Sequence, residues 1–151
     1  MEIRYEEADY SIHNDDILTF VKPYWEETYL TQKYELEFAP GLELMSQLYE
    51  AGVMKGIVGY NESGEMVSVY LCMITPYLFS KGHLVANECL WHMREDVRSV
   101  IKMKELMKEI EKMHNKYNVG ISHLSMHTDK FEPVMNRCGY ALDEYWYMKR
   151  L

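Results

Sequence analysis

Two side chains that can transfer protons lie four residues apart in the middle of the chain. Glu88 and His92 belong to the segment 84–93 (LVANECLWHM), whose composition predicts a strand. Side chains alternate between the faces of a strand, so Glu88 and His92 are expected to share one face and Trp91 to lie on the other. One interpretation is a carboxylate base with an imidazole that relays its proton. The other is a surface carboxylate paired with a lysine, next to a hydrogen-bonded structural histidine.

Other reactive residues have spacings that disfavour a site. His123 and His127 lie in an expected strand, where four residues span about 13 Å, too far for two ligands of one metal ion. The three cysteines, Cys72, Cys89 and Cys138, have no C-x-x-C spacing and no signature of a catalytic thiol. We therefore expect no metal site and no disulfide, and reduced thiols in a cytoplasmic protein.

The composition is that of one globular domain, residues 1–151, in which 48% of residues are apolar. No segment reaches the roughly 18 apolar residues that span a membrane, and the acidic start MEIRYEEADY is not a signal peptide, so no membrane association is expected. Residues 1–50 hold twelve acidic and three basic residues. This asymmetry indicates either ordinary solubility or a surface that attracts a cationic partner, and the lack of a basic patch disfavours nucleic-acid binding.

The N-terminal third is predicted to contain a strand and two helices. Residues 3–8 form the strand, and the apolar residues after Asp15 recur at helical spacing, with Asp15 as the N-cap. Pro23 is expected to kink or end this helix. Residues 41–51 form the second helix, which stops at Gly52.

The rest of the chain is predicted to alternate hairpins with two helices. The expected strands are 53–60, 65–75, 84–93, 121–127 and 140–149, and the expected helices are 99–118, closed by Gly120, and 129–138, closed by Gly139. The order is therefore β-α-α-β-β-β-α-β-α-β. It predicts an α/β (α+β) fold with a central, mostly antiparallel mixed sheet and helices on both faces.

Three stretches within residues 53–151 carry a resemblance to a known family. They are the strand, turn and helix ECLWHMREDVRSVIKMKELM at 88–107, the strand ISHLSMH that follows, and the ending VMNRCGY with YWYMKRL. Together with the order of elements, these stretches resemble the GNAT superfamily of acetyl-coenzyme-A-dependent N-acetyltransferases. The resemblance implies a small, divergent member such as occurs in phages and bacteria. Many members pair, so a homodimer is one expected state.

The resemblance implies an acetyl-CoA site where the strand 84–93 ends and the next helix begins. The strand edge at Trp91–Met93 would pair with the pantetheine amides, and the free N–H groups of the helix N-terminus suit the pyrophosphate. The residues of this loop and first helical turn are Arg98, Ser99, Val100, Ile101, Lys102 and Met103. The family has glycines where this chain has Ile101 and Met103, and Thr128 stands where asparagine is frequent.

The resemblance also implies direct transfer of an acetyl group to a primary amine. Glu88 resembles the family's general base, whereas Met135 occupies the position of its tyrosine acid and leaves Tyr140 as the candidate acid. The expected acceptor is a cationic amine, such as a protein lysine or N-terminus, a polyamine or an aminoglycoside. The missing glycines and Met135 motivate a second hypothesis, a protein of this fold that binds or inhibits a protein partner without turnover.

Overall fold

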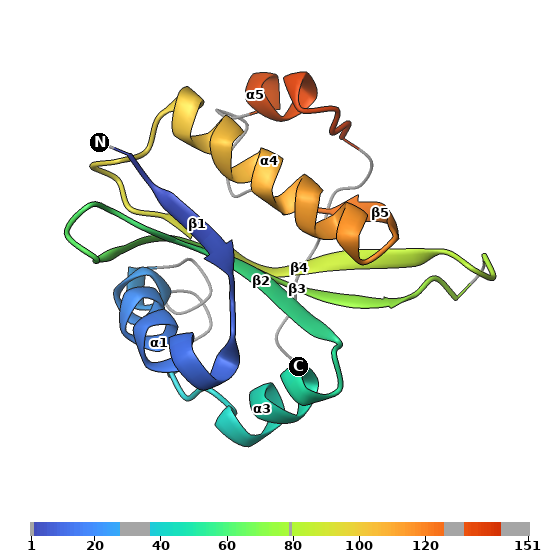
Figure 1. Cartoon of the computed structure of the whole chain (residues 1–151), viewed down its shortest axis with the longest axis horizontal. Coiled ribbons are helices and arrows are strands. Elements are labelled where there is room, and N and C mark those ends of the chain that lie inside the picture. The colour runs from blue at the N-terminus through green and yellow to red at the C-terminus, as the bar shows by residue number, and fades with distance from the viewer. Residues whose placement is uncertain (1, 28–36, 79, 126–131, 143–151) are drawn as a thin grey trace.

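A five-stranded mixed sheet separates two helical layers in the computed structural model, which describes residues 2–27, 37–78, 80–125 and 132–142 (Figure 1). The strands lie in the order β1 to β5, and all neighbours are antiparallel except β4 and β5, which are parallel. This arrangement confirms the predicted fold class. The strands are β1 (Arg4–Glu7), β2 (Met54–Tyr60), β3 (Met66–Pro76), β4 (Leu84–Met93) and β5 (Val119–His123). The helices are α1 (Tyr10–Glu27), α3 (Leu42–Glu50), α4 (Val100–Lys116) and α5 (Glu132–Arg137).

Two successive hairpins form the centre of the sheet, as the sequence predicts. The β2–β3 turn is closed by the side chain of Asn61, whose Oδ1 accepts hydrogen bonds from the backbone N–H groups of Ser63 and Glu65. Gly64 completes this turn with a φ of 78°, which glycine adopts without steric cost. The β3–β4 hairpin is longer and projects beyond the body of the sheet (Figure 1).

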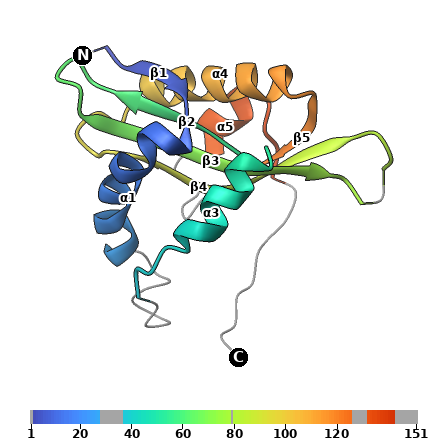
Figure 2. The same ribbon diagram turned by 60° about the horizontal axis from the view of Figure 1, so that its bottom comes forward.

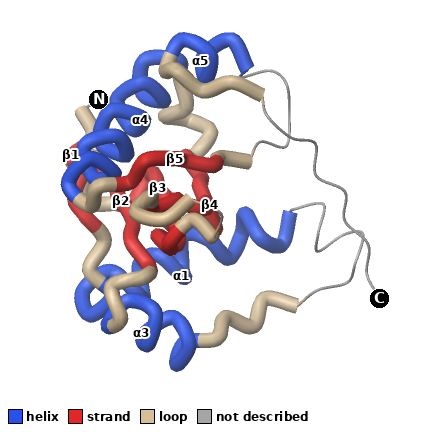
Figure 3. Tube along the Cα trace, turned by 90° about the vertical axis from the view of Figure 1, so that its right-hand side faces the viewer, coloured by secondary structure: helices blue, strands red, loops and turns tan. Residues whose placement is uncertain are grey.

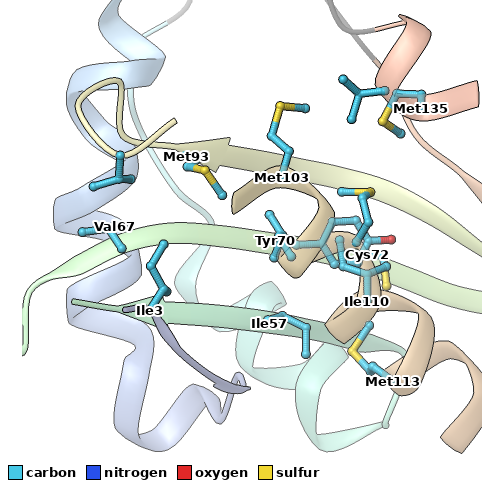
Figure 4. Close-up of a cluster of buried hydrophobic side chains, with 14 of the residues drawn as sticks. Ile3, Ile57, Val67, Tyr70, Cys72, Met93, Met103, Ile110, Met113 and Met135 are labelled. Atoms are coloured by element: carbon cyan, nitrogen blue, oxygen red, sulfur yellow. The ribbon is translucent and has the colours of Figure 1, made fainter. Parts of the chain in front are cut away.

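The larger core lies between the sheet and α4. The apolar residues of α4 recur every three or four positions and are buried against Ile57, Tyr70 and Cys72 on the central strands (Figure 4). The residues that α4 buries are Met103, Leu106, Met107, Ile110, Met113 and His114. This core holds the sheet and α4 together, and α5 adds Val134 and Met135 at its margin.

The opposite face of the sheet carries a smaller core under α1 and α3 (Figure 2). Ile17 and Val21 of α1 are buried against Val58, Val69 and Leu71. Seen from the end of the sheet, α4 and α5 lie on one side and α1 and α3 on the other (Figure 3). Helices therefore cover both faces, as predicted.

Helix α1 begins at Tyr10, six residues before the position after Asp15 where we expected its start. Asp9 caps it, because its Oδ1 accepts hydrogen bonds from the N–H and the hydroxyl of Ser11. Asp15 therefore lies inside the helix, and the predicted N-cap is wrong. Pro23 does not end the helix, which continues to Glu27, the last residue described before the gap at 28–36.

The connection from α4 to β5 also differs from the prediction. The helix ends at Lys116, and Asn118 turns the chain with a φ of 56°, a conformation that asparagine tolerates. Gly120 therefore lies within β5, which begins at Val119 and ends at His123. Gly139 closes α5 with a φ of 85°, as expected. Most of the expected final strand, 143–149, lies outside the described residues. In the described part of the chain, no helix is long and apolar enough to cross a membrane.

Candidate functional site

The parallel strands β4 and β5 stop pairing partway along β4. The last paired residues of β4 and β5 are Asn87 and His123, whose side chains also meet, with 3.1 Å between Oδ1 and Nδ1. Strand β4 continues to Met93, paired only with β3 over residues 88–93 among the residues that the structure describes. The edge of β4 that faces away from β3 is therefore released from β5 along this half of the strand.

A β-bulge at Cys89 decides which side chains flank this edge. Cys72 of β3 lies opposite Glu88, whereas the preceding Leu71 lies opposite Leu90, so that Cys89 is the extra residue. The bulge reverses the alternation of side chains beyond it. The expectation that Glu88 and His92 share a face is therefore wrong.

Glu88 and Trp91 instead share the face that packs on α4. Glu88 lies opposite Cys72 and Trp91 opposite Tyr70, and both of these β3 residues belong to the core under α4. His92 lies opposite Val69, which belongs to the core under α1 and α3. A direct proton relay between Glu88 and His92 thus loses its geometric basis.

Glu88 and Trp91 both bind Ser125, two residues beyond the end of β5. The Ser125 N–H donates a hydrogen bond of 2.7 Å to Oε2 of Glu88, and the Ser125 hydroxyl donates a second bond to the same oxygen. The indole Nε1 of Trp91 donates to the Ser125 carbonyl at 2.8 Å. Side chains of β4 therefore bridge to the chain after β5 at the point where the backbone pairing has stopped.

His92 is part of an aromatic cluster on the α1 face. Its ring stacks on Tyr24, with 4.2 Å between centroids, and lies 5.2 Å from the ring of Phe20, one helical turn earlier in α1. Burial lowers the pKa of His92 to about 4, with Arg98 adding to the effect. His92 is therefore neutral at physiological pH and packs with Phe20 and Tyr24 as part of an aromatic cluster. The pKa of Tyr24 is raised, first by burial and then by the nearby Glu88 carboxylate.

The loop from β4 to α4 brings the predicted cofactor residues to one end of the sheet. Arg98 folds back so that its Nε and Nη2 donate hydrogen bonds of 3.2 and 2.7 Å to the Met93 carbonyl. Ser99 is the N-cap of α4, and its hydroxyl accepts a hydrogen bond from the Lys102 N–H. The Lys102 ammonium is paired with Glu105 at 2.7 Å.

The two residues at the family's glycine positions point in different directions. Met103 is fully buried in the core, whereas Ile101 is exposed in the first turn of α4, next to the exposed Val100. The backbone at the start of α4 is therefore not covered by Met103. The other predicted cofactor residue, Thr128, lies outside the described residues.

Tyr140 lies on the same face of the sheet as Glu88. Its hydroxyl is 3.0 Å from Oγ of Ser122, which pairs with Ala86 on β4, two residues before Glu88. Burial raises the pKa of Tyr140, so the phenol keeps its proton at neutral pH. Met135, at the family's tyrosine position, is buried in the core and has no acidic group.

Sequence reasoning did not identify Ser125, and it had no basis for choosing Tyr24 among the thirteen tyrosines of the chain. The position of Ser125 next to Glu88 depends on where β4 and β5 stop pairing. The position of Tyr24 depends on helix α1, whose start we expected at another residue. A signal existed only for Tyr24, which follows Phe20 by four residues and therefore shares its face of the helix.

Comparisons with known proteins bear on the fold. No protein-family model matches the chain, and no curated protein sequence matches it significantly. The structure is similar to that of an acetyltransferase from Trypanosoma brucei, with a TM-score of 0.71, 15% identity, and coverage of 99% of this chain and 100% of that chain. It is also similar to glucosamine-6-phosphate N-acetyltransferase from Arabidopsis thaliana, with a TM-score of 0.70, 10% identity, and coverage of 99% of both chains.

A third solved structure has the same arrangement of elements. This is a ribosomal-protein-alanine N-acetyltransferase from Brucella melitensis, with a TM-score of 0.68, 10% identity, and coverage of 99% of this chain and 100% of that chain. Each of the three similarities extends over essentially the whole of both chains. The chain therefore has the fold of the GNAT acetyltransferases.

Proposed function

We propose that this protein transfers an acetyl group from acetyl-CoA to a cationic primary amine. One observation carries the proposal: β4 leaves β5 after Asn87 and leads, through a short loop, into the capped N-terminus of α4. An open strand edge offers backbone groups to amides, and a helix N-terminus offers N–H groups to a phosphate. Coenzyme A needs both, because its pantetheine arm carries amides and is followed by a pyrophosphate.

The residues present fit acetyl-CoA at these two places. Trp91 and Met93 lie on the released part of β4, and Arg98 and Ser99 lie between it and α4. Ile101, in place of a glycine, is exposed in the first turn of the helix, so a pyrophosphate bound there would have to lie beside its side chain. When bound, acetyl-CoA supplies a thioester that an amine can attack directly.

Glu88 is the group that we propose to accept the proton of the attacking amine, directly or through one water molecule. It lies on the released half of β4, where Ser125 holds one of its carboxylate oxygens. Nitrogen–carbon bond formation then accompanies loss of the thiolate, which needs a proton. Tyr140 is our candidate donor, because it lies on the same face and its raised pKa keeps the phenol protonated.

A cationic acceptor agrees with the distribution of charge. The first fifty residues, which include α1 and α3, hold twelve acidic residues against three basic ones. A negative surface raises the local concentration of a cation and speeds its encounter with the site. Polyamines, aminoglycosides and protein lysines or N-termini are the classes that we would screen first.

The proposal is tested by binding and by turnover. Isothermal titration calorimetry with acetyl-CoA and coenzyme A is expected to give micromolar affinity, and the absence of binding at millimolar concentration would favour a binding or inhibitory protein of the same fold. With an acceptor in hand, Glu88→Gln is expected to lower kcat by roughly a hundredfold, the contribution of a general base, while acetyl-CoA affinity is retained. Glu62→Gln, in the exposed β2–β3 turn, is the matched control. Unchanged turnover in Glu88→Gln would reject Glu88 as the base.

A further inference from the structure

We propose that Ser125 is a positioning residue that orients the Glu88 carboxylate and stabilises its charged form. The inference rests on the proposed function, in which Glu88 is the base. It adds a residue from the chain after β5 to a site otherwise built on β4, the start of α4 and Tyr140, three residues after α5.

The contacts of Ser125 are on both its backbone and its side chain. Its N–H and its hydroxyl both donate to Oε2 of Glu88, and its carbonyl accepts from Nε1 of Trp91. Because one residue is held at three atoms, it is fixed even though the β4–β5 pairing stops at Asn87 and His123. Hydrogen bonds of Ser125 with Glu88 and Trp91 therefore connect the chain after β5 to β4 where backbone pairing has ended.

Two donors on one carboxylate oxygen have two consequences for a base. Hydrogen bonds to the charged form favour it over the neutral acid, so Glu88 stays ionised to lower pH than it would without them. They also favour one rotamer of the carboxylate, because both bonds require its Oε2 to lie next to Ser125. Ser125 contacts the base and not the reacting atoms, so its effect belongs in the turnover step and its pH dependence.

The critical variant removes only the hydroxyl. Ser125→Ala keeps the backbone N–H bond to Glu88 and the backbone carbonyl that Trp91 contacts, so the fold of this segment is retained. Ser125→Thr restores a hydroxyl and is the rescue variant. Ser80→Ala is the matched control, because the Ser80 hydroxyl contacts His83 in the distant β3–β4 hairpin.

The first readout needs no substrate. Glutamate side chains labelled with ¹³C are titrated by NMR, and the Glu88 signal is identified by its loss in Glu88→Gln. In Ser125→Ala, the midpoint of the Glu88 titration is expected to rise by about half a pH unit to one pH unit, since a hydrogen bond to the charged form is lost at a partly exposed site. Ser125→Thr and Ser80→Ala are expected to keep the wild-type midpoint.

The second readout is turnover. In Ser125→Ala, kcat is expected to fall roughly tenfold with little change in KM, because a misplaced base slows the chemical step. The acidic limb of the pH–kcat profile is expected to move to higher pH with the NMR midpoint. Recovery of both in Ser125→Thr would support the positioning role.

The outcomes separate this inference from the proposed function. An unchanged Glu88 midpoint in Ser125→Ala would overturn the inference, as would a loss of kcat with no movement of the acidic limb. A shifted midpoint in a protein that acetylates no amine would support the coupling of Ser125 to Glu88 and refute the enzymatic role. An equal shift in Ser80→Ala would trace the effect to general destabilisation and also overturn the inference.

Discussion

The hydrophobic cores on the two faces of the sheet differ in size. On one face, α4 buries six residues, including Leu106 and Ile110, in a core that extends across the central strands. On the other face, α3 buries none of its residues, and α1 supplies Ile17 and Val21 to a smaller core. The same strands are thus covered by a large core on the α4 face, here called the thick face. They are covered by a small core on the α1/α3 face, here called the thin face.

Under the proposed function, this difference would give the two faces different tasks. Glu88, Trp91 and Tyr140 lie on the face of α4, where dense packing holds proposed catalytic groups in place. The thinner face carries Tyr24 and His92 in a cover with fewer buried apolar contacts, the kind of region that opens at lower free energy. We infer that the α4 face fixes the chemistry and that the α1/α3 face accommodates the acceptor.

The largest expected effect tests the thickness of the two covers. Leu106→Ala on α4 removes a fully buried side chain and is expected to lower the free energy of unfolding by about 3 kcal/mol. Leu44→Ala on α3, where the side chain is 60% exposed, is expected to change it by less than about 0.5 kcal/mol. Urea unfolding monitored by circular dichroism measures both. Similar losses in the two variants would contradict the comparison.

A second test asks whether the thin face is closely packed anywhere. A Cβ on Gly56 would lie 2.5 Å from the Tyr70 carbonyl oxygen and 2.5 Å from Cδ2 of Leu71, so backbone has to move. Gly56→Ala is therefore expected to destabilise the protein by about 1–3 kcal/mol in the same urea experiment.

Gly120→Ala is the control for this substitution. Its Cβ would meet its nearest neighbour, in His83, at an ordinary 3.5 Å, so little loss of stability is expected. If Gly56→Ala were as stable as wild type, the α1/α3 face would be loosely packed at a position where the structure shows close packing.

The smallest expected effect concerns one histidine on each face. Burial lowers the pKa of His92, on the α1 face, and of His114, on α4, to about 4 each, below the usual 6.5. Between pH 6.5 and pH 4 the unfolded chain binds protons that the folded chain does not, so stability is expected to fall as pH falls through this window.

His92→Phe keeps the aromatic stack and removes one of these two titrations. At pH 5 it is expected to recover about 1 kcal/mol or less of the stability lost relative to pH 7, after allowance for partial exposure. Unfolding curves of wild type and variant at pH 5 and pH 7 measure the difference. Equal pH dependence in the two proteins would show that the thin face lets water and protons reach His92.

Most of the fold is predictable because its signals are local. The alternation and turn residues of 53–93 predict β2, β3 and β4 closely, and the spacing of apolar residues predicts α4. The errors occur where two nearby residues carry the same local signal. Asp9 and Asp15 are both suitable N-caps, and the helix uses Asp9, which accepts hydrogen bonds from Ser11.

The candidate site is less predictable, because its geometry depends on long-range pairing. The strand that carries Glu88 and His92 was predicted, but the bulge at Cys89 follows from its register with β3, which local sequence does not specify. The contact of Ser125 with Glu88 joins residues 37 positions apart. Residue types that can do chemistry are thus visible in the sequence, and the face that each occupies is not.

The extra residue in β4 also affects how this chain is aligned with distant relatives. At identities of 10–15%, an alignment has few anchors, and a gap placed on one side of Cys89 or on the other changes which residues of β4 are matched to a relative. Transfer of roles between such sequences should therefore follow superposed strands, with the bulge as the reference point.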